Sequence, residues 1–328
     1  MTVTSRAVLD DELDLRLDRW FRRHYPALTQ GAIQKMCRTG QVRVDGKRVE
    51  GATRLAPGQT VRIPPLRLDP LPEPKLLPVD PKARQELDAM VLFEDDYLFV
   101  LNKPAGLPSQ GGTGIARHLD GMLEAYRGPG GRPRLVHRLD RDTTGVIVVA
   151  RTAGVAAKLA AAFRTRAVEK TYWAVVAGRP VPVEGRIDLP LVKLDGPGGE
   201  RVGLAKPGDK DVSRAYTDYR TLDHAARKLA WLELRPLTGR THQLRVHCAS
   251  LGTPILGDYP YGERRENNRN SAIVDGLSEQ LHLHARRLVV PHPDGGVLTV
   301  EAGLPAHMAA TFRDLGFDAP APLAPVRR

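Results

Sequence analysis

The sequence predicts an α+β protein of two domains, a small N-terminal one and a larger one built on a mostly antiparallel mixed sheet. The chain has 328 residues, a length that suits about two domains. A proline-rich segment near residue 70 divides it. Beyond that segment, short runs of β-type residues alternate with helical stretches at spacings too irregular for repeating βαβ units.

Two short helices are expected early in the first domain, which we place at residues 1–63. Apolar residues recur at helical spacing from Leu13 onward. Thr29 then offers an N-cap for a second helix that ends at Gly40. Both segments are therefore predicted to be helical.

A hairpin is expected to follow these helices. The strand-like segments 42–44 and 47–49 flank the pair Asp45-Gly46. Asp-Gly between alternating strands favours a tight hairpin, because glycine accepts the positive φ of the turn. A further strand is predicted at residues 60–63.

Positive charge is concentrated in this part of the chain. Residues 1–70 contain 13 Lys and Arg and 8 Asp and Glu, so they carry +5 of the net charge of +11. The residues that fall on the second helix and the hairpin are Lys35, Arg38, Arg43, Lys47 and Arg48. They form either a solvated charged face or one patch that meets phosphate groups, and charge alone leaves both interpretations open.

Seven prolines in residues 64–82 predict an extended linker between the domains. The larger domain is placed at residues 83–318, with a helix at 155–165. Its predicted strands lie at residues 97–101, 146–151, 171–176, 229–234 and 298–301. The Pro-rich tail, residues 319–328, is expected to be disordered.

Composition excludes several classes of protein. No apolar run approaches the roughly 18 residues of a membrane helix, and the acidic N-terminal stretch has no character of a signal or transit peptide. The cytoplasm is therefore the expected location. The two cysteines, Cys37 and Cys248, are too few for a disulfide framework or a Cys-rich zinc site, and no P-loop spacing occurs. Neither a metal nor another cofactor is expected.

The most unusual stretch of the sequence is residues 135–145, which precede a buried-looking strand. Asp140 and Asp142 stand there beside Arg138 and Arg141 in a turn that ends in Thr-Thr-Gly. A loop of this kind, held by a rigid strand, is a natural place for a reactive carboxylate. The same residues are also compatible with a surface turn stabilised by local ion pairs.

Two further residues have a structural and a functional interpretation. Tyr172 lies in an alternating strand on the same face as Ala174, so its ring is expected to face the core, where a tyrosine is more often structural than catalytic. Arg245 lies in a helix predicted over residues 239–252. It either points at a carboxylate in a cleft or lies in solvent.

The first domain resembles the S4 RNA-binding domain, although Asp45 stands where that family usually has Asn. The motifs that carry this resemblance are Arg16-Leu-Asp-Arg19, Gln34-Lys-Met-Cys-Arg38-Thr-Gly40-Gln-Val-Arg-Val-Asp-Gly46-Lys and Leu55-Ala-Pro-Gly58-Gln-Thr-Val61. The larger domain resembles the RluA-type pseudouridine synthases of ribosomal RNA from about residue 91 to about residue 305. Its motifs are Asn102-Lys-Pro-Ala-Gly106, His137-Arg-Leu-Asp140-Arg-Asp-Thr-Thr-Gly145, Lys170-Thr-Tyr172-Trp-Ala174 and Gly239-Arg-Thr-His-Gln-Leu-Arg245.

This resemblance implies an RNA isomerase that needs no cofactor. Asp140 would be the catalytic carboxylate, which either adds to the sugar C1′ or removes a proton from C2′. Arg245 would pair with Asp140, and Tyr172 would stack on the base and act in removing the C5 proton. Arg138 would enter the RNA stack as the target nucleotide flips out. Two further residues are expected to contact RNA near the cleft, Arg240 and Lys103.

The Gly111–Gly114 loop and the segment beginning at Tyr261 resemble the branch that acts on separated uridines of 23S ribosomal RNA, which we take as the expected partner. Thr143 and Thr144 also resemble the branch that acts on a single stem-loop. A tRNA substrate remains an alternative. So does a non-catalytic S4-type RNA-binding or ribosome-assembly protein. A glycoside hydrolase would need a second acid, for which Asp142 is available. A monomer is expected.

Overall fold

The computed structural model describes residues 3–66, 81–112, 114–128, 130–194, 201–226, 228–262 and 274–327. The chain forms two compact units, Met1–Leu77 and Pro78–Arg328, and each is described by itself. Most of the predicted linker, residues 67–80, lies outside the described residues.

The first unit has an antiparallel sheet and two helices, α1 (Leu17–His24) and α2 (Gln30–Arg38). In sheet order, its strands are β1 (Thr4–Ala7), β4 (Thr60–Ile63), β2 (Arg43–Val44) and β3 (Lys47–Arg48). The predicted hairpin is confirmed, because β2 pairs with β3 across Asp45 and Gly46, whose φ angles are +50° and +76°. Positive φ at both residues is the geometry of a tight primed turn.

The cap predicted for α2 is also confirmed, because the Thr29 hydroxyl accepts a hydrogen bond from the Ala32 amide at 3.2 Å. The first helix begins later than predicted. Leu13 is 66% exposed and follows a single 3₁₀ turn at Asp10–Glu12, and the left-handed Asp14 (φ +62°) interrupts the helical path.

The core of the first unit is built from both helices and the sheet. Its fully or nearly fully buried members are Leu17, Trp20, Phe21, Ile33, Cys37, Val42, Val44, Leu55, Val61 and Ile63. Trp20 and Phe21 of α1 are among the largest side chains that solvent does not reach. Burying such side chains is the main stabilising contribution in a unit this small.

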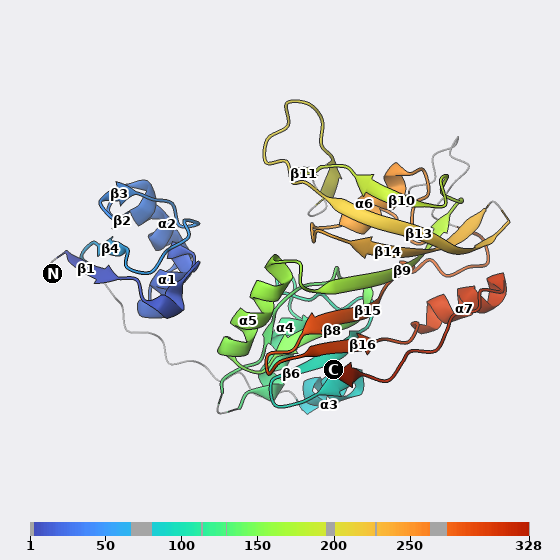
Figure 1. The fold of residues 1–328 in the computed structure, drawn as a ribbon, viewed down its shortest axis with the longest axis horizontal. Coiled ribbons are helices and arrows are strands. Elements are labelled where there is room, and N and C mark those ends of the chain that lie inside the picture. The colour runs from blue at the N-terminus through green and yellow to red at the C-terminus, as the bar shows by residue number, and fades with distance from the viewer. Residues whose placement is uncertain are drawn as a thin grey trace. The chain divides into compact units, whose positions relative to one another are not determined.

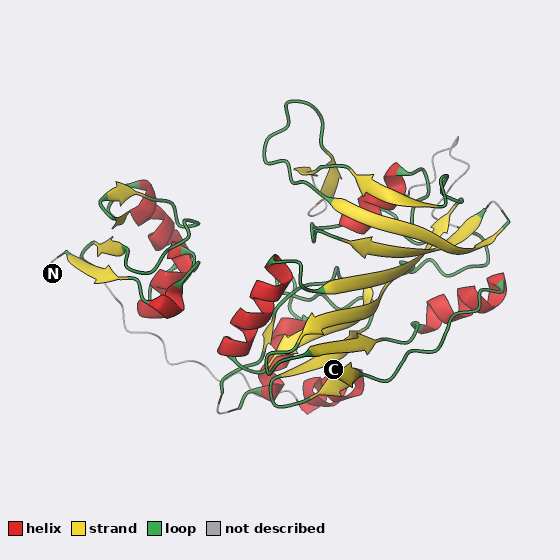
Figure 2. Cartoon of the chain, viewed as in Figure 1, coloured by secondary structure: helices red, strands yellow, loops and turns green. Residues whose placement is uncertain are grey.

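The second unit is built around one large mixed sheet (Figures 1 and 2). Its main path, in spatial order, is β10 (Glu184–Asp188), β13 (Tyr216–Ala225), β14 (Leu229–Pro236), β9 (Glu169–Ala177), β15 (Leu283–Pro291), β8 (Thr144–Ala150), β6 (Leu98–Lys103) and β5 (Val91–Glu94). Short strands extend it, with β7 (Arg134–Leu135) beside β8, and β16 (Val297–Glu301) beside β15. Of these pairs only β15–β8 is parallel, which confirms the predicted fold class.

Helices cover the faces of this sheet, so β8 is buried along its whole length. Alternate side chains of β6 and β8 face two different clusters. One cluster includes α3 (Pro81–Met90) and α4 (Leu119–Met122), which a 3₁₀ turn at Leu123–Tyr126 continues. The other cluster includes α5 (Ala153–Arg164).

Two further helices cover the half of the sheet around β9 and β14. Leu244 and Cys248 of α6 (Gln243–Ser250) pack against β9, β13 and β14. Met308 and Phe312 of α7 (Ala306–Leu315) pack with Trp173 and Trp231. A separate hairpin joins β11 (Leu191–Leu194) to β12 (Arg201–Leu204). No helix in the described parts of the chain is long and apolar enough to cross a bilayer.

The Pro-rich tail is ordered up to Arg327, so the prediction of disorder is wrong for these residues. β17 (Val326–Arg327) pairs with β16, and Arg327 forms an ion pair with Asp294 at 2.7 Å. Arg286 also donates to the Pro320 carbonyl at 2.9 Å. Prolines that lack amide donors still accept hydrogen bonds through their carbonyls, which is how the sheet edge holds this segment.

Candidate active site

The sheet register brings the Asp140 loop and Tyr172 to the same level of the second unit. Gly145, at the start of β8, pairs with Lys103 of β6 on one side and with Ala285 of β15 on the other. Ala285 in turn pairs with Tyr172 of β9. The loop that contains Asp140 therefore ends at a residue, Gly145, that is aligned across the strands with Tyr172.

Gly145 is required at this crossing. Its φ is +106°, and a Cβ built there would lie 2.2 Å from the Ala285 carbonyl oxygen. No side chain fits so close to a neighbouring backbone. The glycine that closes the motif at residues 137–145 thus allows β8 and β15 to approach.

The main chain on both sides of Asp140 is fixed by hydrogen bonds. The Ser109 hydroxyl donates to the Leu139 carbonyl at 2.6 Å and accepts from the Leu139 amide at 3.0 Å. The Lys103 ammonium donates to the Arg141 carbonyl at 2.8 Å and also to the carbonyls of Pro104 and Leu107. The residues before and after Asp140 are therefore both held by buried side chains.

Lys103 does not have the position expected of an RNA contact. Its side chain is fully buried, and its three hydrogen bonds all go to backbone carbonyls. Burial lowers the pKa of Lys103 to about 8, although the carboxylates of Asp142 and Asp140 raise it in part. The lysine thus holds the loop through backbone carbonyls and does not reach solvent.

Arg245 faces Asp140, but its principal partner is Asp258. Arg245 Nε and Nη2 each donate to the Asp258 carboxylate at 2.8 Å, and that carboxylate is fully buried. Arg245 Nη1 lies 3.8 Å from Asp140 Oδ2. Burial lowers the pKa of Arg245, but the hydrogen bonds and charge of Asp258 more than compensate, so the net pKa is raised.

His242 approaches the same carboxylate oxygen. Its Nε2 lies 3.8 Å from Asp140 Oδ2, and its Nδ1 forms a 2.7 Å hydrogen bond with the Tyr261 hydroxyl. That hydroxyl accepts from the Val202 amide at 3.1 Å, and the Tyr261 ring also lies under the Arg245 guanidinium. When the phenol donates to Nδ1, the imidazole proton sits on Nε2 and faces Asp140.

His242 precedes α6 in the left-handed region, with a φ of +52°. The helix predicted from residue 239 therefore begins only at Gln243. This turn lets His242 and Arg245, which straddle the start of the helix, approach the same carboxylate oxygen.

Tyr172 is packed where the sequence placed it, against the core cluster that includes Ala174 and Val176. It also touches the cluster that includes Leu139, next to Asp140. Burial, and secondarily the negative charge of Asp140, raises the pKa of the Tyr172 phenol. The Tyr172 phenol is therefore neutral at neutral pH.

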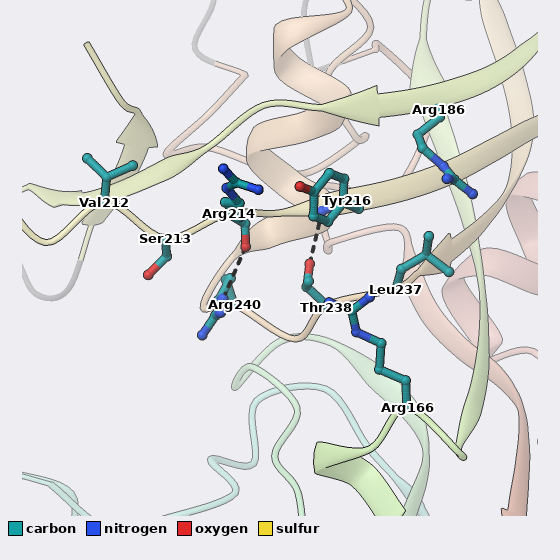
Figure 3. Close-up of a pocket in the computed structure, with 9 residues that line it drawn as sticks. All are labelled: Arg166, Arg186, Val212, Ser213, Arg214, Tyr216, Leu237, Thr238 and Arg240. Atoms are coloured by element: carbon teal, nitrogen blue, oxygen red, sulfur yellow. Dashed lines mark hydrogen bonds between the residues drawn. The ribbon is translucent and has the colours of Figure 1, made fainter. Parts of the chain in front are cut away.

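The remaining predicted site residues are exposed. Arg138 lies at the surface two residues before Asp140, and Arg240 lies at the mouth of a pocket, where its Nε donates to the Arg214 carbonyl at 3.3 Å (Figure 3). The cations of the first unit that were predicted to form a patch, Lys35, Arg38, Arg43, Lys47 and Arg48, are all exposed. Asp142 forms an ion pair with its exposed neighbour Arg141 at 3.2 Å.

Sequence reasoning missed Asp258, His242, Tyr261 and Ser109 as members of this site. In the sequence, Tyr261 stands out only as a marker of substrate class, and His242 only as a member of the motif at residues 239–245. Asp258 and Ser109 stand in no recognisable motif, and only the folded chain brings them to Arg245 and Leu139. Within the described ranges, no group of three or more His, Cys, Asp or Glu side chains is arranged to hold a metal ion.

The chain is similar to known proteins over most of its length. The family described as RNA pseudouridylate synthase matches residues 97–250, and the S4 domain family matches residues 15–61. Ribosomal large subunit pseudouridine synthase C of Rickettsia bellii is 35% identical over 297 residues, which cover 89% of this chain and 95% of the relative. The protein of that name from Escherichia coli is 35% identical over 298 residues, which cover 90% of this chain and 91% of the relative.

Solved structures show the same similarity. Human RNA Pseudouridylate Synthase Domain Containing 4 has a TM-score of 0.59 and 31% identity, and the match covers 72% of this chain and 97% of that one. Human RNA Pseudouridylate Synthase Domain Containing 1 has a TM-score of 0.53 and 27% identity, covering 73% of this chain and 90% of that one.

Proposed function

This chain belongs to the RNA pseudouridylate synthase family and is an RNA-modifying isomerase, and we propose that Asp140 is its catalytic carboxylate. One observation carries this proposal. The Asp140 side chain is 20% exposed, its flanking residues are fixed by Lys103 and Ser109, and it faces the Nη1 atom of Arg245. A partly exposed carboxylate that a rigid scaffold holds in place is suited to attack a bound nucleotide.

The reaction cuts the bond between uracil N1 and the sugar, turns the base and joins the sugar to C5. In one route an Asp140 oxygen bonds to C1′ as the N1–C1′ bond breaks and its electron pair leaves with uracil. C5 of the turned uracil then bonds to C1′ and displaces the Asp140 carboxylate. In the other route Asp140 takes a proton from C2′ as the N1–C1′ bond breaks, and it returns that proton to C2′ when C5 bonds to C1′. In either route Arg245 restricts where the carboxylate points, and Asp258 restricts where Arg245 points.

Tyr172 is assigned to the base. Its neutral ring, packed beside Leu139 and within the field of Asp140, offers a flat surface for the detached uracil. The proton on C5 leaves either to this phenol or to a water molecule next to it. The raised pKa of Tyr172 favours the water route, because a neutral phenol is a weak base.

The target uridine must leave its stack for these atoms to meet. Flipping a nucleotide costs a few kcal/mol, which contacts in the pocket offset. We assign Arg138 to the space that the flipped base leaves, and its exposure two residues before Asp140 supports this role. Arg240, on the loop before α6, is assigned to the RNA backbone.

We extend the proposal to the substrate as 23S ribosomal RNA. Two of the relatives are named ribosomal large subunit pseudouridine synthases. The exposed cations of the S4 unit supply phosphate contacts that a large structured RNA can use. Such a protein is expected to act in the cytoplasm, as a monomer.

The deciding experiment uses RNA tritiated at uridine C5. The full chain is incubated with 23S fragments, 16S RNA and tRNA in parallel. Tritium release without free uracil, strongest on 23S fragments, is the expected result. Free uracil would indicate a hydrolase, release only from tRNA would overturn the substrate class, and neither product would indicate a binding protein.

A further inference from the structure

A hollow of about 600 Å³ opens on the second unit beside the loop that leads into α6. This size is within the range of pockets that hold small ligands. Its lining residues are Arg166, Arg186, Val212, Ser213, Arg214, Tyr216, Leu237, Thr238 and Arg240 (Figure 3). Four of these nine side chains are arginines and none is acidic, so the hollow is built for an anion.

The arginines differ in whether an acidic side chain already neutralises their positive charge. Arg186 is held by two hydrogen bonds to Asp218 at 2.5 and 2.9 Å. Arg166 and Arg214 have no acidic partner among the residues that the structure describes, and both are exposed. A guanidinium group presents paired N–H donors that match the oxygens of a phosphate. Two of them on one hollow therefore suit a phosphodiester.

The rest of the lining suits a nucleotide more than a bare ion. The Tyr216 ring and Leu237 give the hollow a flat apolar portion, and Arg166 extends toward Leu237 and Thr238 from a separate segment of the chain (Figure 3). Aromatic rings at RNA-binding surfaces stack on bases or riboses without regard to sequence. Ser213 adds a hydroxyl donor at the rim.

Hydrogen bonds within one loop connect the hollow to the candidate active site. Gln243, the first residue of α6, accepts hydrogen bonds from the Thr238 hydroxyl at 2.7 Å and from the Arg240 amide at 3.1 Å. The next residue back along the chain, His242, faces Asp140. One anchored loop, residues 237–242, thus connects the arginine hollow to the catalytic carboxylate.

We propose that this arginine hollow binds the phosphate of a nucleotide that flanks the target uridine on the same strand. The inference rests on the proposed function, because it takes RNA as the ligand. A strand whose uridine enters beside Asp140 continues over the loop at residues 237–242. Its next phosphates then meet Arg166 and Arg214.

The test compares two double variants of the full chain. Arg166→Gln with Arg214→Gln removes two of the three cations of the hollow that lack an acidic partner among the described residues. The third, Arg240, stays unaltered because the proposed function already assigns it to the RNA backbone. Arg179→Gln with Arg313→Gln removes the same charge from two exposed positions outside the hollow that also have no acidic partner among the described residues. The probe is the 23S RNA fragment that the unaltered protein binds most tightly. The readouts are Kd and the melting temperature, together with KM and kcat for tritium release.

The first double variant should raise Kd and KM by about fivefold or more and lower the salt slope by about 0.7 for each phosphate that the protein no longer neutralises. Its kcat at saturating RNA and its melting temperature should stay near those of the unaltered protein. The control pair should change Kd by less than about twofold.

A second experiment replaces one phosphate of the RNA at a time with a neutral methylphosphonate. At one flanking position it should weaken binding to the unaltered protein and have no further effect on the first double variant.

Equal Kd values for the two double variants would overturn the proposal, as would the absence of any such flanking position. The failure of the proposed function is a separate result. If the unaltered protein releases no tritium from any RNA, the enzymatic assignment fails. The difference in Kd between the two double variants still decides whether the hollow binds the RNA backbone.

Discussion

Asp258 binds Arg245 through two hydrogen bonds of 2.8 Å, and this contact leaves the third nitrogen, Nη1, to face Asp140 at 3.8 Å. Arg245 is thus oriented by the fully buried carboxylate of Asp258, and not by Asp140, with which it was expected to pair. The planar guanidinium group allows this division, because one edge can be fixed while the other remains available. Asp258 is a positioning residue for the site.

Asp258→Asn should lower kcat by roughly 10- to 100-fold, because a displacement of about 1 Å in a catalytic group is enough for such a loss. Kd for RNA should change little, since Asp258 is buried and does not reach the ligand. Arg245→Lys should give a comparable loss, because an ammonium group cannot satisfy both carboxylates with a fixed fork. Melting curves check that both variants fold. A folded Asp258→Asn variant with full kcat would contradict the positioning role.

Asp140→Asn should abolish tritium release and leave Kd for RNA within about twofold of the unaltered protein. The amide keeps the size of the side chain but can neither attack C1′ nor take a proton. Asp142→Asn is the matched control, since Asp142 stands two residues further on in a surface ion pair. Turnover by the Asp140 variant, or an equal loss in the Asp142 variant, would remove the catalytic assignment.

Lys103 gives a prediction for stability against pH. The pKa of Lys103 is lowered from 10.5 to about 8 by burial. Between these values the unfolded chain binds a proton that the folded chain has released, so this residue makes the free energy of unfolding rise with pH. At pH 9.5 the gain relative to pH 7 is about 2 kcal/mol.

Urea unfolding of the protein and of Lys103→Met at both pH values measures this gain. The difference in free energy between the two proteins should shift in favour of the unaltered protein as the pH rises. Other titrating groups are common to both proteins and cancel in the comparison. A difference that stays constant would show that Lys103 keeps its ordinary pKa.

The basic patch of the S4 unit is predicted to set the salt dependence of RNA binding. Replacing Arg38, Arg43 and Lys47 with Gln should weaken binding and reduce the salt slope by about 0.7 for each phosphate left without its cation, with kcat unchanged. The matched control replaces Arg6, Arg22 and Arg54, which lie on β1, on α1 and before β4. Equal effects of the two triple variants would show that only total charge matters.

Local features of the fold were predictable because each depends on a few adjacent residues. The turn at Asp45 and Gly46, the cap at Thr29 and the apolar run of β8 all follow from short-range preferences, and all are observed. The tail was not predictable in this way. Its order depends on hydrogen bonds and an ion pair to Arg286 and Asp294, which are distant in the sequence.

The candidate site shows the same limit. Asp140, Tyr172 and Arg245 stand in recognisable motifs, so the sequence pointed to them. Asp258 could not be found, because its role is defined by a contact made after the chain turns back following α6. Lys103 was misassigned because a lysine is ordinarily at the surface, whereas here three carbonyls surround its ammonium group.

Lys103 and Ser109 form hydrogen bonds with backbone carbonyl and amide groups, so these contacts do not depend on the side chains of the loop. The side chain at position 141 can therefore vary without disturbing the neighbouring Asp140, and Arg141 points to solvent. In a saturation mutagenesis screen for activity, intolerance should appear at Lys103 and Ser109, which lie 38 and 30 residues before their backbone partners, and not at Arg141. Many of the substitutions that disturb the Asp140 loop would then fall at positions outside the loop itself.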